Sequence, residues 1–295
     1  MFIRILHALR YTYERPVFLE PMTVRMTPRN DVAQRVLRHT MHIEPEAQGC
    51  TWTIEPDGTD ARSIWFLEEQ DRLVIRCDSI VETLRANPFD GILTYAEAST
   101  LPASYPEALR PVLEACRAGT IHPEVGDWAA ELASEVDRDS MRFVLHLNDA
   151  MYNSMRVIER RDGDPYTPEQ TLEEGSGACR DVAMLYVAAC RSQGLAARFV
   201  SGYSTHHPPE VTQHELHAWA EVYLPGCGWR GYDPSLGLAV ADGHVALATG
   251  PDHRLSAPLT GSYRGTGVGS KLEYDIVLTS APTIEALGVV QHDTP

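Results

Sequence analysis

A chain of 295 residues with 43% hydrophobic and 22% charged residues has the composition of a globular protein that buries one large core or two ordinary ones. It carries 25 basic and 41 acidic residues, a formal net charge of −16, so its surface repels phosphate backbones and anionic lipid. We therefore expect neither a nucleic-acid partner nor a membrane partner.

The expected compartment is the cytoplasm. The N-terminus has no apolar run long enough for a signal peptide, and no later segment is long enough to span a bilayer. No two cysteines form a Cys-x-x-Cys pair, and in a reducing compartment scattered thiols stay free. The sequence thus predicts no disulfide framework among Cys50, Cys77, Cys116, Cys179, Cys190 and Cys227.

Residues 1–84 alternate polar and apolar positions in about six short runs separated by turn signals. Such runs without helices predict a small all-β, sandwich-like domain or half-barrel. It contains no constellation of reactive side chains, so we expect a structural or substrate-shaping role. Residues 85–120 are punctuated by Pro and Gly, hold at most one short helix, and are predicted to connect two domains.

Residues 121–295 are predicted to form the second domain, a core that opens with helices. Helices are expected after Asp127 and Asp139, each placed to cap the helix that follows, and a short helical turn from Pro168. The next helix is expected from Cys179, with one buried stripe and a stop at Gly194. The stripe comprises Val182, Leu185, Tyr186, Ala189 and Cys190.

Strands are predicted after this helix, at 197–203, 217–225 and 229–234. Hairpin-type breaks at His206–Gln213 and Pro225–Gly228 separate them, and further strands are expected around 244–250 and 271–280. A helix followed by an antiparallel sheet indicates an α+β, papain-like layout rather than a doubly wound one.

Three side chains in this core could form a thiol-based catalytic site. A helix N-terminus favours the thiolate form of a cysteine, and Cys179 stands there, after glycines that include Gly177 and leave room for a substrate carbonyl. His217 opens a strand and could act as base and then as acid. Asp233 ends the next strand and could fix the tautomer of His217. Taken singly, each residue would more readily be interpreted as structural: a buried thiol, a satisfied core histidine and a turn aspartate.

The same residues lie in motifs that resemble the bacterial branch of the transglutaminase-like superfamily. These motifs are a Gly-x-Cys-Arg-Asp helix start, a His-Ala-Trp-x-Glu strand and a Gly-Trp…Asp-Pro segment. The strands with HALRYTYERPV and MTPR, and the segment HVALATGPDHRLSAPLTGSYRG, are similar to the same branch, so the resemblance covers nearly the whole chain. It implies a papain-like core with a triad of Cys179, His217 and Asp233. The chain departs from the family at Gly250-Pro251-Asp252, where Gly-Arg-Asp is usual.

The resemblance implies a thiol enzyme that acts on peptide or side-chain amide bonds through an acyl-thioester on Cys179, with hydrolysis favoured over transfer to an amine. The expected partner is a peptide or protein substrate. A non-catalytic peptide- or protein-binding module with the same fold is the alternative, and a zinc-dependent hydrolase is a third possibility.

The rest of the site is less defined by the sequence. Trp219 is a candidate substrate-binding residue beside Gly177, although a core aromatic fits as well. The Cys179 backbone N–H is the one oxyanion donor that can be named. We predict no cofactor and no metal, because no EF-hand run is present and the following cluster fits no zinc signature. That cluster comprises His206, His207, His214 and His217 with Glu210 and Glu215.

Overall fold

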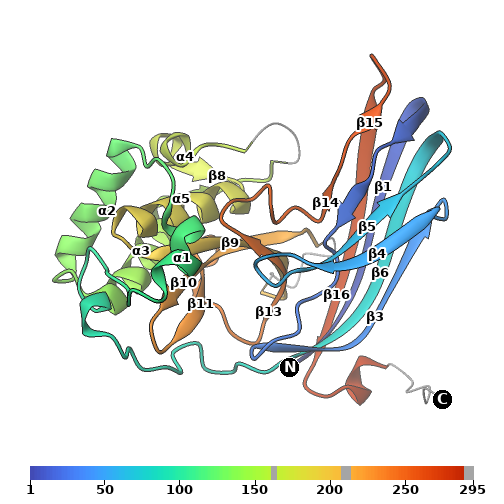
Figure 1. Ribbon diagram of the computed structural model, residues 1–295. Coiled ribbons are helices and arrows are strands. Elements are labelled where there is room, and N and C mark those ends of the chain that lie inside the picture. The colour runs from blue at the N-terminus through green and yellow to red at the C-terminus, as the bar shows by residue number, and fades with distance from the viewer. Residues whose placement is uncertain (161–164, 207–213, 289–295) are drawn as a thin grey trace.

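The computed structural model describes residues 1–160, 165–206 and 214–288. Two antiparallel sheets make up its N-terminal part and face each other across an apolar core (Figure 1). The larger sheet contains β1 (Phe2–Leu19), β3 (Gln34–Glu44) and β6 (Gln70–Thr83). The smaller one contains β2 (Met22–Val24), β4 (Gly49–Ile54) and β5 (Asp60–Trp65). The predicted β-rich, sandwich-like N-terminal region is confirmed.

Both N-terminal sheets are completed by strands from the end of the chain. β16 (Ser270–Ala281) pairs with β1 along its length, from Phe2 opposite Ala281 to Tyr13 opposite Ser270. Two short strands, β14 (Leu259–Thr260) and β15 (Tyr263–Arg264), pair with β2 and β1. Strand pairing therefore crosses the predicted boundary at residue 120, and the division into three residue ranges stays a prediction.

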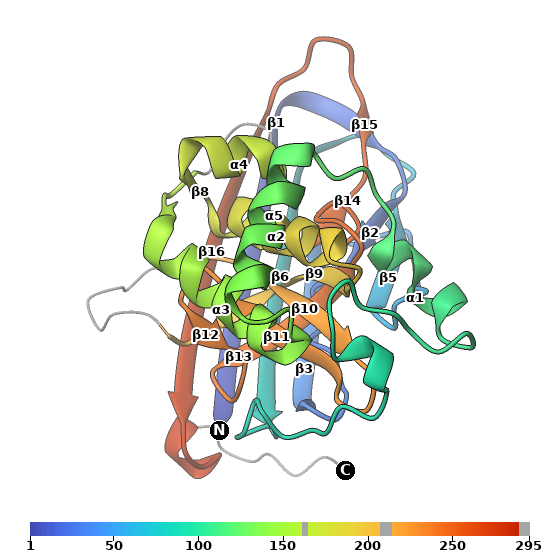
Figure 2. The same cartoon turned by 90° about the vertical axis from the view of Figure 1, so that its left-hand side faces the viewer.

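Most helices lie on one side of the molecule. They are α1 (Arg110–Arg117), α2 (Pro123–Glu135), α3 (Ser140–Ser154), α4 (Pro168–Glu174) and α5 (Cys179–Ser192), with 3₁₀ turns η1 (Ala96–Ala98) and η2 (Glu285–Leu287). Figure 2 looks onto α2, α3 and α4, which stand in front of α5. None of the helices within the described ranges is long and apolar enough to cross a membrane.

The capping predictions had different outcomes. Asp139 caps α3 as predicted, because its side chain accepts a hydrogen bond from the backbone N–H of Arg142 at 2.8 Å. The predicted start of α2 after Asp127 is wrong. That helix begins at Pro123, after His122, because proline at the first position has the helical φ and needs no N–H partner there. Asp127 is an exposed residue inside the helix.

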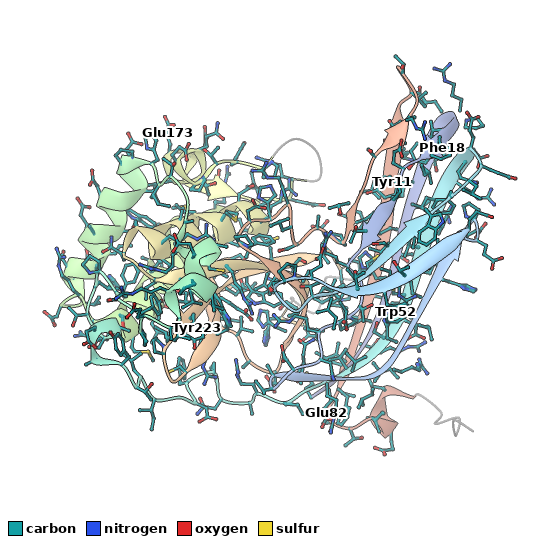
Figure 3. The ribbon with its side chains drawn as sticks, in the orientation of Figure 1. Tyr11, Phe18, Trp52, Glu82, Glu173 and Tyr223 are labelled. Atoms are coloured by element: carbon teal, nitrogen blue, oxygen red, sulfur yellow. The ribbon has the colours of Figure 1, made fainter. Side chains whose placement is uncertain are left out.

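The core sheet is antiparallel throughout, in the order β12–β11–β10–β9–β13. Its strands are β9 (Ala196–Ser204), β10 (His217–Leu224), β11 (Gly228–Asp233), β12 (Leu238–Ala239) and β13 (His244–Gly250). The predicted break at Pro225–Gly228 is a turn in which Cys227 N–H donates to Leu224 O at 2.9 Å. The other predicted break lies almost wholly outside the described residues. Tyr223, labelled in Figure 3, packs from β10 into a small cluster with α1.

The central helix α5 packs against β9 and β10 and is covered by α2, α3 and α4. Its predicted apolar stripe is confirmed as buried, and burial extends around the whole helix, from Asp181 to Cys190 except Met184. After α5 the chain turns at Gly194, whose φ of +79° favours glycine. The structure thus confirms the α+β class, with a cysteine-bearing helix on an antiparallel sheet.

The two parts meet where β13 lies against the N-terminal sheet (Figure 1). Apolar side chains of β1, β6 and β16 form one buried cluster with Tyr203 and with Val245, Leu247 and Ala248 of β13. The Gln34 side chain both donates to Ala246 O at 2.9 Å and accepts from Ala246 N at 2.8 Å. Thr83 Oγ1 donates to Asp242 O at 2.8 Å, just before β13. This edge strand is therefore held from both sides.

Candidate active site

Cys179 is the first residue of α5, and the start of that helix is fixed by Asp181. The fully buried carboxylate of Asp181 accepts from Ala178 N at 2.9 Å and from Tyr166 N at 2.9 Å. The first bond satisfies a backbone donor at the helix start, and the negative charge lies at the positive end of the helix dipole. The bond from Tyr166 also ties the segment before α4 to the helix that begins at Cys179.

Gly177 lies in β8 (Ser176–Gly177), which pairs in parallel with β7 (Arg156–Val157) just before α5. A Cβ atom at this position would lie 2.8 Å from Cβ of Asp181 and 3.3 Å from Cγ2 of Thr171. Close packing against Asp181 therefore requires glycine here. Its predicted contact with substrate stays a prediction.

His217 is brought between Cys179 and Asp233. Its Nε2 donates to Asp233 Oδ2 at 2.6 Å, and its ring is also within hydrogen-bonding range of the Cys179 side chain. Since Nε2 is used by Asp233, Nδ1 is the nitrogen left to serve the thiol. Burial lowers the pKa of His217, but the charge of Asp233, the hydrogen bond to it and the nearby Cys179 raise that pKa to about 10. The imidazolium form is therefore strongly favoured beside the thiol.

Asp233, with 0% exposure, ends β11 and is held by both of its oxygens. Oδ1 accepts from the Ser235 hydroxyl at 2.6 Å, from Ser235 N at 3.1 Å and from Leu236 N at 3.2 Å. Burial raises the pKa of this carboxyl, but the His217 charge and the hydrogen bonds from His217 and His244 outweigh burial and lower it. The carboxylate is thus ionised and fixed in direction.

His244 is the residue of this site that the sequence did not reveal. It opens β13, is 4% exposed, and its Nε2 lies 3.0 Å from Asp233 Oδ2, the same oxygen that serves His217. In the sequence it is a lone histidine at the head of an apolar run, which indicates a core position. The available signal was its polar character in a strand otherwise expected to be buried.

Trp219 lies next to the rings of His217 and His244 and is 1% exposed. Its ring centroid is 5.2 Å from that of His244, edge to face, and 6.2 Å from that of His217. It packs with Val200 and Ala246, which is the environment of a core aromatic. The predicted role in binding substrate is untested, and the structure gives Trp219 a supporting position under the imidazoles.

Three of these groups could be considered as metal ligands. The possible ligand atoms of His217, Asp233 and His244 lie within 4.8 Å of one another. Both imidazole Nε2 atoms, however, lie at hydrogen-bonding distance from one carboxylate oxygen, and a metal would have to replace both bonds. We interpret the group as a hydrogen-bonded network. In the cluster considered from sequence, His214 and Glu215 contact β16 instead, and His207 and Glu210 lie outside the described residues.

The remaining cysteines differ in exposure, and all six are free. Cys190 is buried in the core as predicted, and Cys227, whose reactivity would have required exposure, is buried too. Burial also raises the pKa values of Cys77, Cys116 and Cys190. Cys50 is exposed on β4.

Comparison with known proteins identifies the class. Residues 127–234 match the family model of the transglutaminase-like superfamily, and residues 3–82 match that of the bacterial transglutaminase-like N-terminal region. The chain belongs to the transglutaminase-like superfamily, in its bacterial branch. The predicted family is confirmed, and its fold is that of a group of thiol enzymes.

Individual relatives agree with this assignment over nearly the full length. An uncharacterized protein of Mycobacterium leprae is 24% identical over 275 residues, covering 90% of this chain and 94% of the relative. An uncharacterized protein of Mycobacterium tuberculosis is 27% identical, with 88% and 86% covered. Among solved structures, a "putative cysteine protease" from Cytophaga hutchinsonii matches with a TM-score of 0.70 at 20% identity, covering 96% of this chain and 92% of that one. The whole two-part architecture is therefore shared.

Proposed function

We propose that this protein is a cysteine-dependent amidase or peptidase that cleaves amide bonds through an acyl-thioester on Cys179. The observation that carries the proposal is the contact chain from Cys179 through His217 to the buried Asp233, in which the pKa of the imidazole is raised to about 10. An imidazolium beside a thiol favours the thiolate, which is the nucleophile.

The reaction would proceed in two steps. In the first, Sγ of Cys179 attacks the carbonyl carbon, the C–N bond breaks, and His217 gives its proton to the leaving amine. In the second, water attacks the thioester while His217 accepts a proton, the C–S bond breaks, and a carboxylic acid leaves. The N–H of Cys179 has no hydrogen-bond partner within the described part of the chain and could stabilise the oxyanion.

We propose water as the main acyl acceptor. The proposed acyl donor is a peptide or protein substrate, at a backbone amide or a side-chain amide. The name of the Cytophaga hutchinsonii structure supports hydrolysis, while transfer to a primary amine would use the same three residues. We also propose a cytoplasmic location, since six free cysteines fit a reducing compartment. The acidic surface, with a net charge of −16, supports a substrate other than nucleic acid.

The chain contains its own control for testing the thiol. Cys50 is exposed on β4 of the N-terminal part, on the side where Figure 3 labels Trp52, away from the helices. Iodoacetamide labelling followed by mass spectrometry measures both thiols in one sample. We expect Cys179 to react at least about tenfold faster than Cys50 near pH 6, because a model thiol with a pKa near 8.5 is almost wholly protonated there.

The His217→Ala variant should bring Cys179 to the rate of Cys50 or below while Cys50 is unchanged. Incubation of the wild type with a library of peptide amides, with and without a primary amine, then identifies the acceptor from product masses. Equal labelling of the two cysteines together with no product from any amide would contradict the enzyme and favour the binding-module alternative.

A further inference from the structure

Asp233 serves two histidines with one oxygen atom. Its Oδ2 accepts from His217 Nε2 at 2.6 Å and from His244 Nε2 at 3.0 Å. A triad needs only the first of these bonds. The second joins the site to β13, an edge strand that otherwise contributes nothing to the reacting groups.

We propose that His244 is a positioning residue, whose Nε2–H holds the Asp233 carboxylate in the orientation that keeps His217 directed at Cys179. It acts through Asp233 and does not contact the substrate. The inference deepens the proposed function, on which it rests, by adding a fourth residue to the same site.

Contacts other than the bond to Asp233 also hold the ring of His244 in place. Trp219 packs edge to face against it, and the ring of His206 lies 5.2 Å away, over the space that the missing side chain of Gly243 leaves open. Gln34 bonds both backbone groups of Ala246, two residues further along β13. The N-terminal domain and the core thus hold the donor rigidly, and a rigid donor can orient a carboxylate.

The bond to Asp233 is the polar contact that the His244 ring makes in the described structure. Nε2 carries hydrogen when it donates, in either protonation state, and Nδ1 has no hydrogen-bond partner among the described residues. A substitution of His244 therefore removes one hydrogen bond from Asp233 without leaving another side chain unpaired. This makes the position suitable for a clean test.

Removal of the donor has a defined electrostatic consequence. With one hydrogen bond fewer, the Asp233 charge is less compensated and acts more strongly on His217, so the imidazolium is held to higher pH. The other titratable groups around the two rings are Cys179 from α5, His206 after β9 and Asp242 before β13, and the substitution leaves all three in place. The carboxylate also gains freedom to rotate, and His217, which stays paired with it, turns away from Cys179.

The test is an NMR titration of histidine ring resonances in ¹⁵N-labelled wild type, His244→Leu and His244→Gln, with His217→Gln to assign the signal. Glutamine places an N–H donor near the position of the imidazole Nε2, and leucine does not. We expect His217 to titrate near pH 10 in the wild type and about one pH unit higher in the leucine variant. Alkylation of Cys179 relative to Cys50 should fall about tenfold to hundredfold with leucine. The glutamine variant should keep the titration within about half a pH unit, and the alkylation ratio within about threefold, of the wild type.

An unchanged titration in a folded His244→Leu protein would overturn the inference. A fall in alkylation that is equal for leucine and glutamine, with the titration unmoved, would also overturn it, because it would show a packing role only. If the leucine variant does not fold, His244→Asn replaces it, since its shorter amide cannot reach Oδ2. None of these measurements needs turnover, so a protein without amidase activity can still show the coupling, and the two proposals fail separately.

Discussion

The electrostatics of the site centre on the buried carboxylate of Asp233. This carboxylate accepts five hydrogen bonds. Its charge is the main reason that the pKa of His217 is raised despite burial. An imidazolium that is too stable gives up its proton reluctantly to a leaving amine. Sharing one oxygen between His217 and His244 tempers that stability while it keeps the geometry. Oδ2 of Asp233 thus influences both the proton affinity of His217 and its orientation, and the proposed reaction depends on both.

The replacement Asp233→Asn should destabilise the protein in a pH-dependent manner. The lowered pKa of Asp233 contributes stability above its unfolded pKa of about 3.9, and this is lost as pH falls. The raised pKa of His217 contributes stability that is complete below about 6.5 and is lost as pH rises through about 10. We expect a loss of about 3–5 kcal/mol between roughly pH 4 and 6.5, which shrinks towards pH 10. Urea unfolding at several pH values measures it.

Asp149→Asn is the matched control, because Asp149 is exposed on α3. It should change the free energy of unfolding by less than about 0.5 kcal/mol at every pH. A destabilisation by Asp233→Asn that stays constant from pH 4 to pH 10 would show that its charge is not coupled to His217.

The sequence indicated Cys179, His217 and Asp233 because each begins or ends an element with a clear pattern. His244 could not be found in this way. Its partner Asp233 lies on β11, which β10 and β9 separate from β13 in the sheet, so the two side chains approach each other across two strands. The local sequence of a histidine followed by buried aliphatic residues does not indicate which residue will be its hydrogen-bond partner. The missing information was the order of the strands, which is not a local property.

Helix starts show how a local rule can be correct at one position and overridden at another. Asp139 accepts a backbone hydrogen bond and caps α3, whereas Asp127 was preceded by Pro123, a stronger start signal four residues earlier. The β1 strand was likewise underestimated, since its 18 residues continue through Arg15 and Pro16. The pairing of β1 with β6 shifts register between Thr12 and Val17, so the strand continues through an irregularity at these two residues.

The two aspartates allow a direct test of capping. Asp139→Ala should cost about 1 kcal/mol of folding stability, because the Arg142 N–H loses its acceptor at the start of α3. Asp127→Ala, in the exposed interior of α2, should be neutral or slightly stabilising, since alanine is the better helix former. Thermal unfolding of the two variants measures the difference. Equal losses would mean that Asp127 stabilises its helix in some way other than capping.

Strands from the beginning and from the end of the chain pair with each other in one sheet. β1 at the start and β16 at the end lie side by side, and the sheet that they share supports β13. Patterns in the sequence predicted both strands but not their pairing, because loop closure over such a distance leaves no local signal. The two family models match residues 3–82 and 127–234, which contain strands of the N-terminal part and of the core.

This support can be tested at Gln34, which is 4% exposed and bonds both backbone groups of Ala246. Gln34→Leu keeps the approximate volume but removes the acceptor of the buried Ala246 N–H, at a cost of about 1–3 kcal/mol, whereas Ala246 O keeps its hydrogen bond from Arg29 N. If the N-terminal sheet holds β13 and thereby His244, Cys179 should also be alkylated more slowly relative to Cys50. Arg35→Ala is the control, because the neighbouring Arg35, an exposed residue also on β3, forms an ion pair with Glu82 of β6 and should affect neither property. A folded Gln34→Leu protein with wild-type alkylation would show that β13 is ordered by the core sheet alone, and the N-terminal domain would then have to serve the site in another way.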